Sequence, residues 1–218
     1  IIYGFEVATQ LLKYQHLQID SFKLGQRLDT LINQPVLILP VAYRGHAISF
    51  VRCGDFWAKC DRGKNSLKEG TVNIYYISNP EKLDVSFYKK LLYQKQSERY
   101  VHHGLNNELG LKAVATLPLS PQVSGNCSWA NIEAAVPTAF MLMHLDVNAL
   151  NAELMAKVAD VALMVYESWL TFDKDRALGE CIQGFDNLSA PRRASKASVL
   201  GTILFQACDY GVSKHMER

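Results

Sequence analysis

The hydrophobic pattern of this chain changes once along its length, and that change limits the folds available to it. Every strand-like run, rich in β-branched and aromatic residues, lies before residue 120, at 35–40, 41–52, 57–61, 71–78 and 111–119. Such residues favour strands. Every long segment after residue 128 instead has apolar residues at helical spacing. Strands followed by helices predict an α+β fold with a small, mostly antiparallel sheet.

Helices are also expected around and after this sheet. Helical spacing occurs at 3–14, 20–33, 83–100, 130–144, 148–172 and 197–210. Pro137 lies inside the fourth of these segments and predicts a kink or a split there. A polar break is expected at 189–193.

These elements predict two parts of the chain. Residues 1–144 are expected to form a core, with helices in 1–34 and the sheet and its following helix in 35–144. Residues 145–218 are expected to form a helical extension packed on that core, because the helix at 148–172 is apolar enough to require burial.

The residues from His46 to Asp61 predict a β-hairpin with a defined register. Gly54-Asp55, between two apolar runs, is a signal for a two-residue turn. With these two residues as the loop, His46 and Asp61 lie on one face of the sheet as diagonal neighbours, because side chains alternate faces along a strand. Diagonal Cβ atoms lie about 7 Å apart. An imidazole and a carboxylate can form a hydrogen bond at that separation.

Cys127 lies where a turn-rich segment becomes an apolar helix. Residues 120–126 are rich in loop formers, and from Ala130 the chain is apolar. A thiol in the first turn of a helix meets free N–H groups and the positive end of the helix dipole, which favour the nucleophilic thiolate. Gln122 carries an amide that, with the Cys127 N–H, could stabilise an oxyanion.

Composition narrows the classes of protein further. With 49% hydrophobic and 20% charged residues the chain is typical of a globular protein. The formal net charge of +2 predicts no general attraction to nucleic acid. No apolar run approaches the roughly 18 residues of a membrane span. The opening residues, 1–3, are neither an initiator methionine nor a charged signal region, which favours a piece of a longer polypeptide.

The cysteines predict a reducing compartment, with no metal and no cofactor. They are scattered and contain no CxxC pair: Cys53, Cys60, Cys127, Cys181 and Cys208. This pattern argues against a disulfide scaffold or a zinc site. Cys181 and Cys208 lie among packing residues and are interpreted as structural. His102 and His103 are adjacent, so they diverge on any regular element, and no partner lies at ligand spacing.

A cysteine nucleophile needs a base and a group that orients the base. His46 and Asp61 can supply both. The resulting order, His46, Asp61, Gln122 and Cys127, resembles the adenoviral-endopeptidase-like clan of cysteine proteases. The resemblance is carried by segment 45–51, by the return to Asp61 and by segment 122–129.

The resemblance implies a papain-like or ubiquitin-like-modifier-protease-like core, with the nucleophile at a helix N-terminus and a C-terminal helical subdomain. The clan includes proteases for ubiquitin and SUMO-type modifiers, bacterial effector deubiquitinases and effector acetyltransferases. It implies a cysteine protease or isopeptidase with Cys127, His46, Asp61 and Gln122 as catalytic residues. Its substrate would be a protein, such as ubiquitin or a ubiquitin-like protein. A bacterial effector of this kind would act in the host cytosol.

Two other functions stay open. If an amine or hydroxyl, rather than water, resolves the acyl-enzyme, the chain is an acyltransferase on the same scaffold. Effector acetyltransferases prefer glutamate where this chain offers Asp61. The third alternative is a non-enzymatic protein-interaction module with a degenerate triad.

Overall fold

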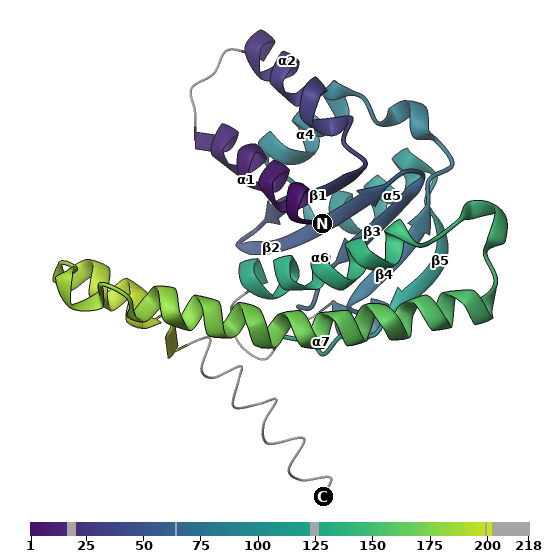
Figure 1. The fold of residues 1–218 in the computed structure, drawn as a ribbon. Helices are drawn as coiled ribbons and strands as arrows, with labels where there is room; N and C mark the ends of the chain where they lie inside the picture. Colours follow the sequence, from purple (N-terminus) through teal and green to yellow (C-terminus); the bar gives the residue numbers. More distant parts are fainter. Residues whose placement is uncertain (17–20, 64, 123–126, 199, 202–218) are drawn as a thin grey trace, which may run out of the picture. The chain divides into compact units, whose positions relative to one another are not determined.

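The strands of the computed structural model form an antiparallel sheet in which each strand pairs with the next one along the chain (Figure 1). The structure describes residues 1–16, 21–63, 65–122, 127–198 and 200–201. Within these residues there are five strands: β1 (Val36–Tyr43), β2 (His46–Cys53), β3 (Phe56–Cys60), β4 (Val72–Tyr76) and β5 (Lys112–Leu117). The predicted α+β class and antiparallel sheet are confirmed. The papain-like core remains a prediction.

The hairpin of β2 and β3 has the predicted register. Cys53 pairs with Phe56 across the two-residue turn, and Ser49 pairs with Cys60. Gly54 has a φ of 55°, which glycine adopts without steric cost. Turn chemistry and strand parity were therefore sufficient to predict this hairpin.

The start of β2 differs from the prediction. Residues 41–52 were expected to form one strand, but β1 continues through Pro40 to Tyr43, and a tight turn at Arg44-Gly45 leads into β2 at His46. Pro40 is tolerated because β1 is an edge strand that pairs with β2 alone among the described strands.

The helices before residue 144 pack on both faces of the sheet (Figure 1). They are α1 (Ile2–His16), α2 (Ser21–Ile32), α3 (Ser66–Glu69), α4 (Val85–Tyr93), α5 (Leu105–Leu109) and α6 (Cys127–Met143), with short helical turns at Pro80–Lys82 and Tyr100–Gly104. One face of the sheet, with Phe50 and Trp57, shares a core with α1, α2, α4 and α5. The other face meets α6, where Ser49 donates to Asn131 O and Cys60 Sγ lies 3.4 Å from Thr138 Oγ1.

Two helix predictions are corrected within this part of the chain. The helix expected at 83–100 ends at Tyr93, where the Gln96 side chain donates to the carbonyl oxygens of Lys90 and Gln94 and caps the last turn. Helix α6 is continuous through Pro137, so the expected split does not occur. Burial of its small residues, Ala134 and Ala139 among them, holds the helix on the sheet.

The chain divides into two compact units, residues 1–163 and 164–218. Helix α7 (Ala152–Ile182) begins in the first and extends beyond the predicted 148–172, after a helical turn at Val147–Ala149. In the second unit a helical turn at Phe185–Asn187 precedes helical residues 190–198, so the break predicted at 189–193 is wrong. Residues 202–210 of the predicted last helix, with Cys208, lie outside the described residues. The domain boundary at 144/145 remains a prediction.

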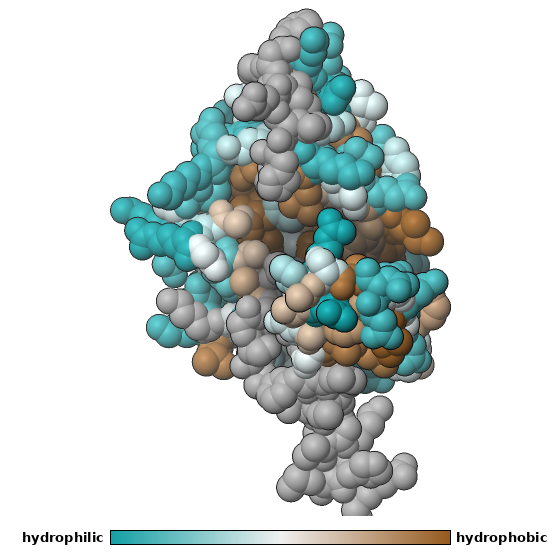
Figure 2. All heavy atoms as spheres, turned by 90° about the vertical axis from the view of Figure 1, so that its left-hand side faces the viewer, coloured by the Kyte–Doolittle hydropathy of each residue, from teal (hydrophilic) through white to brown (hydrophobic). Residues whose placement is uncertain are grey.

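Apolar side chains are also exposed on the surface. Large ones lie on α1, including Ile2 at 80% exposure, and on α7, including Met164 and Phe172. The face shown in Figure 2 mixes hydrophobic and hydrophilic side chains. None of the described helices is both long and apolar enough to cross a bilayer.

A buried ion pair joins the segment after β3 to α6. Arg62 Nη1 lies 3.2 Å from Glu133 Oε2, and both side chains are buried. Arg62 also donates to Ser120 O at 2.7 Å and to Ala130 O at 3.3 Å. The guanidinium therefore links three segments of the chain.

We expect Glu133→Ala to lower the free energy of unfolding by about 3–5 kcal/mol, because it leaves the Arg62 charge buried without its carboxylate. The double variant Arg62→Met/Glu133→Leu should lose less, since it buries no unpaired charge. Urea denaturation of both variants checks this. A Glu133→Ala variant as stable as the wild type would contradict it.

Candidate catalytic site

The His46 imidazole and the Asp61 carboxylate meet as the hairpin register predicts. His46 is the first residue of β2, and Asp61 directly follows β3. His46 Nε2 donates to Asp61 Oδ1 at 2.8 Å. Asp61 is buried, and the His46 side chain is 24% exposed. The predicted hydrogen bond is confirmed, and it leaves His46 Nδ1 free for a second partner.

Gly63 holds this pair in place in two ways. Its backbone N–H donates to Asp61 Oδ1 at 2.9 Å. A Cβ at this position would lie 2.6 Å from His46 Cε1, closer than non-bonded carbon atoms approach. Residue 63 must therefore be glycine for the imidazole to occupy its position.

These contacts shift the pKa values of both groups. The hydrogen bond to Asp61 raises the pKa of His46 above its ordinary value, against the opposing effect of burial. Burial alone would raise the pKa of Asp61, but the hydrogen bonds from His46 and the Gly63 N–H outweigh it, and the pKa of Asp61 is lowered. The site therefore favours an imidazolium beside a carboxylate.

Cys127 is the first residue of α6, as predicted, and its thiol lies beside the histidine. The Ala47 N–H donates to Cys127 Sγ at 3.3 Å. A hydrogen bond between the thiol and His46 also contributes to the raised pKa of His46. Since Nε2 is engaged by Asp61, Nδ1 is the ring nitrogen that can take the thiol proton.

Gln122 lies beside the same histidine. Its backbone N–H donates to Arg62 O at 2.8 Å, and its side chain lines a pocket of about 510 Å³ together with His46. Gln122 Oε1 is buried and has no hydrogen-bond partner among the described residues. An unpaired buried amide oxygen in a pocket suits contact with a ligand that donates a hydrogen bond. Residues 123–126, which connect Gln122 to Cys127, lie outside the described part, so its oxyanion role remains a prediction.

Asn131 is a residue of the site that the sequence did not single out. Its Nδ2 donates to Ala47 O at 2.6 Å, and its Oδ1 accepts the Arg62 N–H at 2.7 Å. Ala47 directly follows His46, and Arg62 directly follows Asp61. Asn131 itself lies about one helical turn after Cys127. One amide therefore connects all three chemical groups. An asparagine within an apolar helix is the signal that could have identified it.

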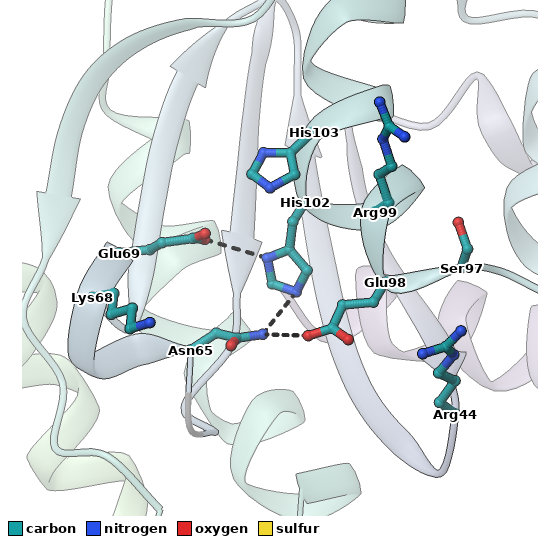
Figure 3. Close-up of a pocket in the computed structure, with 9 residues that line it drawn as sticks. All are labelled: Arg44, Asn65, Lys68, Glu69, Ser97, Glu98, Arg99, His102 and His103. Atoms are coloured by element: carbon teal, nitrogen blue, oxygen red, sulfur yellow. Dashed lines mark hydrogen bonds and ion pairs between the residues drawn. The ribbon is translucent and has the colours of Figure 1, made fainter.

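His102 is a second residue that the sequence analysis did not place at the site. It is buried, with Nε2 2.8 Å from Tyr43 Oη and 3.7 Å from Asp61 Oδ2. Its Nδ1 lies 3.2 Å from Lys59 Nζ. The same nitrogen lies 3.3 Å from Glu69 Oε2 (Figure 3). No group of three or more potential metal-ligating side chains is found among the described residues. His102 therefore lies close to Asp61 Oδ2, the carboxylate oxygen that has no hydrogen-bond partner among the described residues.

The chain is an α+β protein with a candidate thiol site. This site consists of a cysteine at the start of a helix and a histidine–aspartate pair at the end of an antiparallel hairpin. Among solved structures the chain is similar to the Legionella effector AnkH, with 48% identity, a TM-score of 0.74 and coverage of 98% of this chain. It covers 44% of the AnkH chain, so it spans less than half of that structure. No family model and no curated protein matches the chain.

We expect Gly63→Ala to weaken the His46–Asp61 hydrogen bond, because the added methyl group displaces the imidazole. The pKa of His46, measured by NMR titration, should fall toward about 6.5. Gly179→Ala is the matched control, since a Cβ there meets nothing within 4 Å. An unchanged pKa of His46 in Gly63→Ala would disprove this account of Gly63.

The two pKa shifts also predict how the pair stabilises the fold at different pH values. Because the pKa of His46 is raised, its contribution is present below about pH 6.5 and is lost as the pH rises through the raised value. Because the pKa of Asp61 is lowered, its contribution is present above about pH 3.9 and is lost as the pH falls through the lowered value.

The Tm difference between the wild type and Asp61→Asn should therefore be largest between about pH 4 and pH 6.5. Thermal melts from pH 3 to pH 9 measure it. Asp29→Asn, at an exposed position on α2, is the control. A Tm difference that does not vary with pH would count against a charged pair.

Proposed function

We propose that this chain is the catalytic part of a cysteine protease or isopeptidase that acts by thiol–acyl chemistry. The observation that carries the proposal is the His46–Asp61 hydrogen bond of 2.8 Å, with the Cys127 thiol at the start of α6 beside the same imidazole. Nucleophile, base and orienting group are then arranged as such catalysis requires. The clan with the order histidine, aspartate, glutamine, cysteine is the family to which we assign this chemistry.

The reaction begins with transfer of the Cys127 proton to His46 Nδ1. The raised pKa of His46 supports this step, because it stabilises the imidazolium that forms. The thiolate attacks the substrate carbonyl carbon, and the resulting oxyanion is held by the Cys127 N–H and the Gln122 amide. Asp61 keeps the imidazole oriented and stabilises its positive charge.

The tetrahedral intermediate then collapses to a thioester. The carbon–nitrogen bond breaks, and His46 gives its proton to the departing amine. A water molecule, deprotonated by His46, attacks the thioester carbonyl and releases the acid. Cys127 regains its proton, so that the enzyme returns to its starting state.

The similarity to a Legionella effector supports a bacterial effector that acts on host proteins. Cys53, Cys60 and Cys127 are free thiols, which fits the reducing host cytosol. The substrate would be a protein, with ubiquitin and ubiquitin-like proteins as the first to test. Ubiquitin carrying a C-terminal thiol-reactive group would then label Cys127.

Iodoacetamide at pH 7 should alkylate Cys127 at least about tenfold faster than Cys53, because an ordinary thiol is only a few per cent ionised at this pH. Burial raises the pKa of Cys53, and it raises the pKa of Cys60 to about 11, so that both serve as slow references within the molecule. Peptide mass spectrometry measures the three rates.

His46→Ala should remove the difference in rate, and Cys127→Ala should abolish hydrolysis of any substrate while leaving the Tm nearly unchanged. If Cys127 reacts no faster than Cys53 in the folded wild type, the thiol is not activated and the chain is an interaction module instead.

A further inference from the structure

The turn before His46 holds Arg44 in a backbone conformation that arginine rarely adopts. Arg44 has a φ of 45° and Gly45 a φ of 78°, in a two-residue turn between β1 and β2. Turns with positive φ at both central positions strongly prefer asparagine, aspartate or glycine at the first. Arg44 is the one non-glycine residue with positive φ in the described part of the chain. Strained residues of this kind cluster at functional sites.

The Arg44 side chain lies where two pockets adjoin. One pocket, of about 510 Å³, contains His46 and Gln122, and the other, of about 560 Å³, lies beside His102 (Figure 3). Both are lined by Arg44, Asn65 and Glu98. We call the two together the polar groove. It extends from His46, which with Cys127 forms the candidate dyad, past Arg44 to His102.

Positive charge is available for a ligand in this groove. Arg44, Lys68 and Arg99 line it, and all three side chains are exposed. None of them forms an ion pair with another residue that the structure describes. The backbone therefore holds Arg44 at the junction of the pockets without an internal partner for its guanidinium.

The acidic residues of the groove do not cancel this charge. Glu69 is already paired, with Lys59 Nζ at 2.5 Å, and the pKa of Glu69 is lowered despite the opposing effect of burial. Glu98 accepts a hydrogen bond of 3.5 Å from Asn65 Nδ2 and is the other carboxylate lining the pocket. Three cations that form no ion pair among the described residues, and one remaining carboxylate, thus line this pocket.

We propose that Arg44 binds an acidic side chain of the polypeptide substrate next to His46, while Arg99 and Lys68 add positive charge in the adjoining pocket. The statement that the ligand is a substrate rests on the proposed function, but binding of an acidic peptide at Arg44 does not require that function. A guanidinium binds a carboxylate through two parallel hydrogen bonds. A protein ligand is favoured over nucleic acid because the chain's net charge is only +2, whereas nucleic-acid binding depends on many phosphate contacts.

Fluorescence anisotropy of a labelled hexaglutamate peptide tests the subsite, with Cys127→Ala as the parent protein so that no reaction occurs. We expect binding that weakens with added salt, and about tenfold weaker binding when Arg44→Asn is added. Arg27→Gln, which removes an arginine from the exposed face of α2 outside the groove, should bind as the parent does. Hexaglutamine should not bind.

Arg44→Asn should also keep or raise the Tm, because asparagine suits the turn better than arginine. A sharp fall in Tm would show that Arg44 serves the fold and would overturn the proposal. Equal binding by the parent and Arg44→Asn, or tighter binding of an oligonucleotide than of hexaglutamate, would also overturn it. Slow alkylation of Cys127 would instead reject the thiol chemistry and leave the subsite standing.

Discussion

The amide of Asn131 forms the interaction on which the candidate site depends. Its two hydrogen bonds, of 2.6 Å and 2.7 Å, bind the backbone directly after His46 and directly after Asp61. Asn131 lies on the helix that begins at Cys127, so the same residue helps to set the positions of Cys127, His46 and Asp61. Buried polar groups that are fully paired rigidify a structure. Catalytic groups must be held within about 0.5 Å of a productive geometry. A single buried amide at the junction of helix and sheet provides that restraint.

Further contacts around Asn131 and Asp61 restrain the site. The Arg62–Glu133 pair anchors the segment after β3 to α6, on the same face as Asn131. His102 faces the other carboxylate oxygen of Asp61 from the opposite side. Asp61 Oδ1 is held by two hydrogen bonds, whereas Oδ2 lies 3.7 Å from His102 Nε2 and has no hydrogen-bond partner among the described residues. The hydrogen bonds from His46 and the Gly63 N–H, with a smaller contribution from His102, keep the pKa of Asp61 lowered although burial opposes its charge.

Local patterns predicted the parts of the structure that depend on neighbours in the sequence. The hairpin parity placed His46 and Asp61 on one face, and the change from loop to apolar residues placed Cys127 at the start of α6. Sequence spacing could not predict the partners of Asn131, because Ala47 lies 84 residues away. Nor could it predict that His102 meets Tyr43 across 59 residues. These contacts arise only when the sheet brings distant segments together.

The missed turn at Arg44-Gly45 has a different cause. Local preference favours a continuous strand there, because arginine is not a turn former at positive φ. Natural sequences agree with their folds at most positions, and the exceptions concentrate where function requires them. The histidine and aspartate are embedded in buried contacts that tolerate few changes, whereas Arg44 is exposed at the rim of the same groove. A chain built in this way can change what it recognises at residue 44 without disturbing the buried contacts that hold the dyad.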